Sequence, residues 1–343
     1  MGYLIGKGED AAFWAKLRQD YDIYAPKRFP KQGRFSDTDI IRYDRVESGA
    51  EIVFDEKSDY PAKEVLTPIC QAILYFTEDE YRASKASQRP ILLFMRPCDI
   101  HAMQHQEKIY LENGGVADLY YRRMRERVHI VLMECSEGWD TCFCVSMGTN
   151  RVEDYALAVR QTEQGLLFDV REDALKTYFA GQPAADFQPV FVEKNNVSVT
   201  VPEIADKELL LKLKEHPFWQ QFNGRCESCG ACTIACSTCT CFTTRDVIYG
   251  DNPAVGERRR VTSSCQVSGF DDMAGGISFR KDAASRMRYK MLHKFRDYKA
   301  RFGDHHMCVG CGRCTDRCPQ FISVTATLEK MAAAVAELSS ASK

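Results

Sequence analysis

Two cysteine runs with the same spacing constrain this chain more than any other feature. The first, CESCGACTIAC, begins at residue 226, and the second, CVGCGRCTDRCP, begins at residue 308. Each reads C-x2-C-x2-C-x3-C, and the second ends in proline, as the bacterial ferredoxin run does. Three cysteines at two-residue intervals let a tight loop bind three corners of a cubane. The spacing therefore predicts two [4Fe–4S] clusters.

The fourth cysteine of each run is expected to bind the cluster of the other run, as in two-cluster ferredoxins. The first cluster is then assigned to Cys226, Cys229, Cys232 and Cys318, and the second to Cys308, Cys311, Cys314 and Cys236. Glycines within the runs allow close backbone approach to the sulfurs: Gly230, Gly310 and Gly312. Zinc is the alternative, but its four-cysteine sites usually take two cysteines from each of two knuckles.

Further cysteines follow two apolar, strand-length segments in the N-terminal part. ILLFM precedes RPCDI, and VHIVLM precedes ECSEGWDTCFC. If these segments are neighbouring buried strands, their following loops meet at one edge of a sheet. The hypothesis for these cysteines is a third [4Fe–4S] cluster, with zinc or ordinary thiols as alternatives. The set consists of Cys98, Cys135, Cys142 and Cys144.

The remaining cysteines carry weaker signals. Cys239, Cys241 and Cys265 are one thiol short of an all-cysteine cubane, and buried thiols are weighed evenly against a ligand or redox role. Cys70, in the apolar segment VLTPICQAILYF, is expected to pack in the core. The seven histidines are scattered and no glycine-rich nucleotide motif occurs, so no catalytic residue is predicted.

The uneven distribution of cysteines predicts two domains and an α+β fold. Eleven of the sixteen cysteines follow residue 223. Residues 1–205 are expected to form an α/β-type domain, with a hairpin in YALAVRQTEQGLLFDVRE. Residues 206–343 are expected to form a mainly helical ferredoxin-like domain with helices over 279–302 and near the C-terminus. The basic residues of 279–302 form either a solvated face or a charge that offsets anionic clusters.

Composition excludes several classes of partner. The net charge of −2 gives no basic footprint for nucleic acid. No apolar run approaches the roughly 18 residues of a membrane span, and the N-terminus does not resemble a signal peptide. Sixteen cysteines in a chain expected to be cytoplasmic are more typical of metal ligands than of disulfides.

Five segments together resemble the iron–sulfur electron-transfer subunit of the dissimilatory anaerobic sulfite reductase: ILLFMRPCDIHAM, DTCFCVSMGT, CESCGACTIACSTCTCF, SSCQVSGF and CVGCGRCTDRCP. The wider group includes the iron–sulfur β subunits of cytosolic NiFe sulfhydrogenases. The likeness covers nearly the whole chain. The ferredoxin runs are shared by many iron–sulfur proteins, so the N-terminal cysteine loops are the more specific evidence for this group. Ser237 departs from the proline that related subunits often have, and this change is not expected to affect ligation.

The resemblance implies an electron-transfer role in an anaerobic respiratory complex, without catalytic residues of the chain's own. A flavin subunit that oxidises NAD(P)H would supply electrons, and a sirohaem iron–sulfur subunit would use them to reduce sulfite to sulfide. The alternative within this class is the β subunit of a cytosolic NiFe hydrogenase or sulfhydrogenase. An alternative of another class is a zinc-stabilised interaction scaffold.

Overall fold

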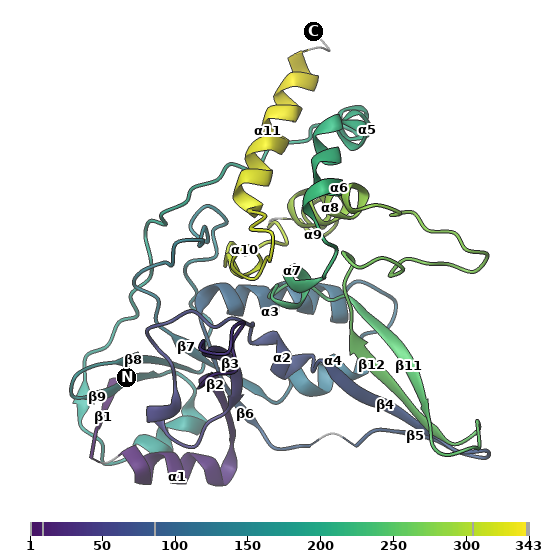
Figure 1. Cartoon of the computed structure of the whole chain (residues 1–343). Helices are drawn as coiled ribbons and strands as arrows, with labels where there is room; N and C mark the ends of the chain where they lie inside the picture. The colour runs from purple at the N-terminus through teal and green to yellow at the C-terminus, as the bar shows by residue number, and fades with distance from the viewer. Residues whose placement is uncertain (1, 9, 86, 304, 341–343) are drawn as a thin grey trace.

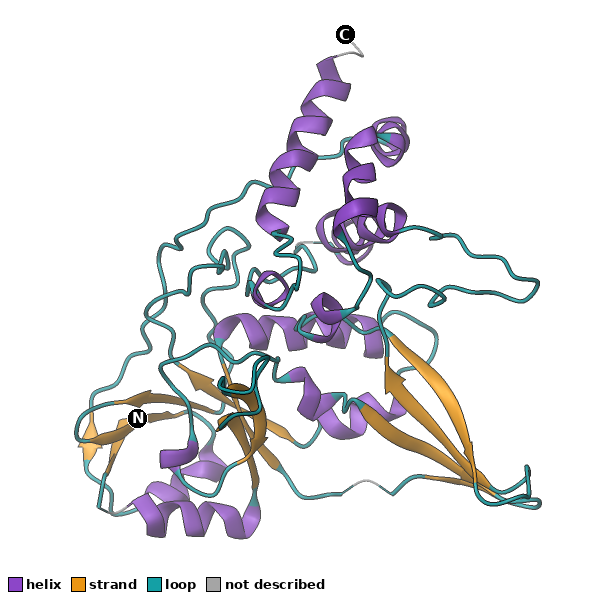
Figure 2. Cartoon of the chain, in the orientation of Figure 1, coloured by secondary structure: helices purple, strands orange, loops and turns teal. Residues whose placement is uncertain are grey.

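The structure is a computed structural model that describes residues 2–8, 10–85, 87–303 and 305–340. Strands gather in the lower half of the view in Figure 2, and the helices of the cysteine-rich part lie above them. The α+β class predicted from the sequence is confirmed. No helix within the described ranges is long and apolar enough to span a membrane.

An eight-stranded mixed sheet forms the base of the molecule. In spatial order its strands are β10 (Ala184–Ala185), β1 (Gly2–Gly6), β9 (Gly165–Val170), β8 (Leu157–Gln161), β7 (Val128–Met133), β6 (Ile91–Met95), β2 (Asp22–Phe29) and β3 (Ile40–Arg45). The predicted strands ILLFM and VHIVLM are confirmed as β6 and β7, which pair in parallel. The predicted hairpin is confirmed as the antiparallel pair β8 and β9.

Both faces of this sheet are covered, which explains why its central strands are apolar without interruption. Alternate residues of β6 enter opposite cores: Leu92 and Phe94 pack on the side of α1 (Asp10–Asp20), and Leu93 packs on the other. Helices on that second side are α2 (Lys63–Leu66), α3 (Pro97–Leu111) and α4 (Leu119–Arg125). In Figure 1, α3 lies between the sheet and the short helices of the cysteine-rich part.

A second, four-stranded sheet joins distant parts of the chain. Its order is β11 (Phe242–Ile248), β12 (Gly256–Thr262), β4 (Cys70–Phe76) and β5 (Tyr81–Ala83), and it extends outward in Figure 1. The sequence does not predict β11 and β12. The expectation that Cys70 packs in the core is wrong, because Cys70 begins β4 and is exposed. The division of the chain near residue 205 stays a prediction, although this sheet takes strands from both sides of it.

The cysteine-rich part is built on helices around a third core. They are α5 (Lys207–Glu215), α6 (Gln221–Arg225), α7 (Ala231–Ile234), α8 (Ala283–Leu292), α9 (Tyr298–Phe302), α10 (Arg313–Asp316) and α11 (Val324–Ser340), with a π-helical turn at His293–Asp297. Short 3₁₀ helices lie at Gly49–Glu51, Asp173–Phe179 and Pro217–Gln220. The helix predicted over 279–302 begins only at Ala283, because Asp282 caps it and forms a capping box with Ser285.

A buried ion pair joins the base of the molecule to the cysteine-rich part. Arg313 of α10 donates to both carboxylate oxygens of Asp99 on α3, at 2.7 and 2.8 Å, and the two side chains are 3% and 1% exposed. Ser237, which follows the first run, donates to Asp99 at 2.9 Å, and Arg313 also donates to Ser58. These contacts satisfy the polar groups that burial removes from water.

We expect Asp99→Asn to lower the free energy of unfolding by about 3–5 kcal/mol, since it leaves the guanidinium buried without its counter-charge. The measurement is the denaturant midpoint of anaerobically purified protein. The matched control is Glu193→Gln, which removes the exposed ion pair with Arg151 and should leave the midpoint close to that of the wild type. Equal effects of the two variants would show that Arg313 and Asp99 do not hold the parts together.

Candidate metal centre

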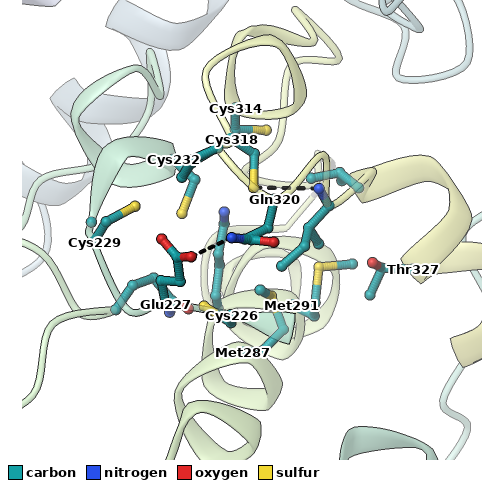
Figure 3. A pocket seen from close by; sticks show the side chains of 16 residues that line it. Cys226, Glu227, Cys229, Cys232, Met287, Met291, Cys314, Cys318, Gln320 and Thr327 are labelled. Carbon is teal, nitrogen blue, oxygen red and sulfur yellow. Dashed lines mark hydrogen bonds between the residues drawn. The ribbon is translucent and has the colours of Figure 1, made fainter. Parts of the chain in front are cut away.

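One cavity brings together cysteines from both runs. Its lining includes three cysteines of the first run and two of the second: Cys226, Cys229, Cys232, Cys314 and Cys318. Figure 3 shows Cys229 and Cys232 on one side of this cavity and Cys318 reaching toward it from the second run. Met287, Met291 and Ile322 provide apolar walls. All four cysteines that the sequence assigns to the first cluster therefore line the same space.

A second cavity adjoins the first and also draws on both runs. Its cysteines are Cys236 of the first run and Cys308, Cys311 and Cys314 of the second, which is the set that the sequence assigns to the second cluster. Cys314 and Lys290 line both cavities, so the two spaces share a wall. Crossed ligation stays a prediction, but the fold places every cysteine that it requires.

The two loops repeat the same backbone geometry. Gly230 and Gly312 have φ of 78° and 74° and precede α7 and α10, and the third residue of each run, Ser228 or Gly310, has φ of 56° or 67°. The left-handed conformation favours glycine. Ser228 is tolerated in the first loop, where its hydroxyl accepts from Arg286 at 2.7 Å. At Gly310 a Cβ would meet the backbone of Phe143 and Cys144 at 2.6 Å, so the second loop needs glycine.

The donor set fits iron–sulfur clusters. Five thiols line the first cavity and four line the second, and Cys314 is common to both. The walls are mainly apolar, and backbone groups hydrogen-bond several of the sulfurs. The Ile322 amide donates to Cys318 Sγ at 3.3 Å, and the backbones of Ser228 and Gly310 hydrogen-bond the thiols of Cys226 and Cys308. N–H donors to cluster sulfurs are a recurrent feature of such sites. If clusters are bound here, these thiols would ligate iron and the clusters would supply one-electron chemistry.

Among the described residues, no three or more His, Cys, Asp or Glu side chains are arranged to hold a single metal ion. A cubane differs from a single ion because each of its four irons takes one cysteine, so the thiols surround the cluster instead of converging on one point.

Charge and burial oppose each other at these sulfurs. Burial raises the pKa of the Cys314 thiol to about 12 and also raises the pKa of Cys308. Burial works against the charged form of Lys290, but the sulfurs of Cys232 and Cys314 outweigh it and raise the pKa of Lys290 above its ordinary value. The thiol of Cys239 hydrogen-bonds Cys236 and lowers the pKa of Cys236. At Cys314, burial therefore has the larger effect on the pKa, and the positive charge of Lys290 offsets part of it.

The N-terminal cysteines lie where the parallel strands β6 and β7 end. Cys98 is in the first turn of α3, and the other three follow β7. Their charges influence one another in the pairs Cys98 with Cys144, Cys135 with Cys142, and Cys142 with Cys144. Cys142 Sγ also lies 3.7 Å from the Cys311 carbonyl oxygen. The parallel pairing of β6 and β7 brings the two loops to the same edge of the sheet. A third cluster on these four cysteines stays a prediction.

The other thiols form two contacts, and one of them involves Cys236 of the second cavity. Cys239 hydrogen-bonds Cys236, and Cys241 hydrogen-bonds Cys265. The sequence did not identify three of the charged groups around the sulfurs: Asp99, Lys63 and Arg313. Lys290 and Lys294 belong to the basic residues of 279–302, for which the sequence allowed a charge that offsets anionic clusters. The spacing of Lys290 and Lys294 indicates that they lie on the same side of a helix, because they are one helical turn apart beside apolar residues at helical spacing.

Gly310→Ala tests the close approach of the second loop to the N-terminal part. We expect a lower thermal midpoint and less iron per chain, because the added methyl group would push the loop away from Phe143. The control is Gly275→Ala, where φ is also positive at +84° but nothing lies within 4 Å of the added Cβ. The control carries only the left-handed strain of about 1 kcal/mol. Equal losses in the two variants would contradict a steric requirement at Gly310.

The comparisons with known proteins agree with this geometry. Residues 225–322 match the family described as 4Fe-4S dicluster domain. Sulfhydrogenase 2 subunit beta of Pyrococcus furiosus is 27% identical over 337 residues, which cover 93% of this chain and 95% of that protein. No solved structure matches. The chain is therefore homologous to a sulfhydrogenase β subunit, with a 4Fe–4S dicluster domain in its C-terminal part.

Proposed function

We propose that this iron–sulfur electron-transfer subunit passes single electrons between two partner subunits through clusters held by crossed ligation. The first cluster is held by Cys226, Cys229, Cys232 and Cys318, and the second by Cys308, Cys311, Cys314 and Cys236. The observation that carries the proposal is the pair of adjoining cavities. Each is lined by three cysteines of one run and the fourth cysteine of the other, and Cys314 of the second run also lines the first cavity.

The proposed relay has one end near the surface and one in the interior. Cys229 is exposed, and Phe321, three residues after Cys318, is 78% exposed. Glu227 and Gln320 are hydrogen-bonded within the first cavity (Figure 3). The second cavity lies against the N-terminal cysteine loop. A third cluster on Cys98, Cys135, Cys142 and Cys144 would extend the row toward the large sheet.

For the partners, we propose a cytoplasmic complex in which a flavin subunit oxidises NAD(P)H and a sirohaem subunit reduces sulfite. The segments that resemble the iron–sulfur subunit of anaerobic sulfite reductase support this choice. The second candidate is the β subunit of a NiFe hydrogenase, which the homologue's name supports at least as well. In both cases the substrate chemistry belongs to a partner, and this chain supplies the path.

The first experiment is anaerobic purification of the chain with its native partners. We expect a brown complex whose broad visible band bleaches with dithionite, and about 8 iron atoms per chain for two clusters or about 12 for three. With three, Cys98→Ala and Cys142→Ala should each lower iron to about 8. Sirohaem in the complex would identify it as a sulfite reductase, and nickel would identify it as a hydrogenase. A colourless, zinc-containing protein would overturn the electron-transfer proposal.

Cys318→Ala distinguishes crossed from local ligation. We expect it to impair the cluster built on the first run, because Cys318 lines the cavity of Cys226, Cys229 and Cys232. Electron paramagnetic resonance of the reduced protein separates the two cluster signals, and Cys226→Ala identifies the signal of the first run. Cys308→Ala identifies the signal of the second cluster. If Cys318→Ala removes that same signal and leaves the first-run signal intact, crossed ligation is refuted.

A further inference from the structure

Helix α8 and the turn after it carry three buried cations in one row. Arg286, Lys290 and Lys294 are spaced four residues apart and are 6%, 4% and 5% exposed. In contrast, Lys281 and Lys299, before and after this row, are exposed. The solvated face weighed from the sequence therefore does not describe the row, which faces the interior.

The two lysines of this row have no carboxylate partner within ion-pair distance among the residues that the structure describes. Burying an ammonium group is costly without a compensating charge, and like charges at this spacing repel each other. Lys294 donates to the Thr238 hydroxyl at 3.0 Å, which satisfies one hydrogen bond but supplies no negative charge. A compensating anion must therefore come from the cavities.

The lysines differ in which cavity they face. Lys290 lines both cavities, hydrogen-bonds Cys232 of the first run, and lies close enough to Cys314 of the second for their charges to interact. Lys294 lines only the second cavity, where its nearest sulfurs include Cys236 and Cys308. Lys290 is thus shared between the two cavities, and Lys294 belongs to the second cavity alone.

We infer that the positive charge of Lys290 raises the reduction potentials of both clusters, and that the charge of Lys294 raises the potential of the second cluster alone. The inference rests on the proposed crossed ligation. A thiolate-ligated [4Fe–4S] cluster is anionic and gains one more negative charge on reduction. A fixed positive charge nearby stabilises the reduced form more than the oxidised form, and a dry environment strengthens this effect.

The test is a redox titration of the anaerobically purified complex, followed by electron paramagnetic resonance. Lys290→Met should shift both cluster potentials to lower values, and Lys294→Met should shift only that of the second cluster. Lys290→Arg keeps the charge and should leave both potentials near those of the wild type. Lys299→Met is the exposed control and should shift neither. Iron content is measured for every variant.

A fully loaded Lys290→Met protein with either potential unchanged would overturn the shared role. If Lys290→Met loses iron, Lys290→Gln is titrated in its place. If both neutral variants lose iron and Lys290→Arg is fully loaded, the positive charge at this position is required. If all three variants lose iron, the electrostatic role of Lys290 is overturned. Absence of cluster signals from the wild-type complex would instead refute the proposed function, so the two failures are distinguishable.

Discussion

The arrangement of the cysteine-rich part depends on the buried contact between Arg313 and Asp99. Arg313 lies between two cysteines of the second run, and Asp99 follows Cys98 on α3. Ser237, the residue after the first run, bonds to the same carboxylate. One carboxylate therefore positions both cysteine runs and the first N-terminal cysteine relative to one another. Bidentate geometry and hydroxyl partners offset much of the desolvation that burying this pair requires.

The same interior gathers positive charge that the overall composition does not reveal. The chain has a net charge of −2, yet buried lysines surround the sulfurs. Lys63 is buried and donates to the carbonyls of Thr233 and Cys239, and Lys290 and Lys294 are buried beside the cavities. Such groups are costly to bury in an apolar core, so their placement indicates that the interior is organised around anionic centres.

What the sequence predicts well is what local spacing determines. The two cysteine loops, the strands β6 and β7, and the hairpin of β8 and β9 follow from patterns within short segments. The second sheet does not, because β4 pairs with β12, which lies far along the chain, and no local pattern encodes that pairing. The roles of Arg313 and Ser237 were missed for the same reason. Their side chains become a network only when three distant segments meet.

The two cysteine loops are repeated in geometry but not in environment. The first has Ser228 and the exposed Cys229, whereas the second is enclosed by Thr141 and Phe143, which leave room only for Gly310 and Gly312. Enclosure in an apolar setting opposes the added negative charge of a reduced cluster and so lowers its potential, while nearby cations oppose that effect. Lys290 faces both cavities, and Lys294 faces only the second. With a cluster bound in each cavity, the additional cation would lie where burial makes reduction hardest, and these opposing effects would bring the two potentials closer together.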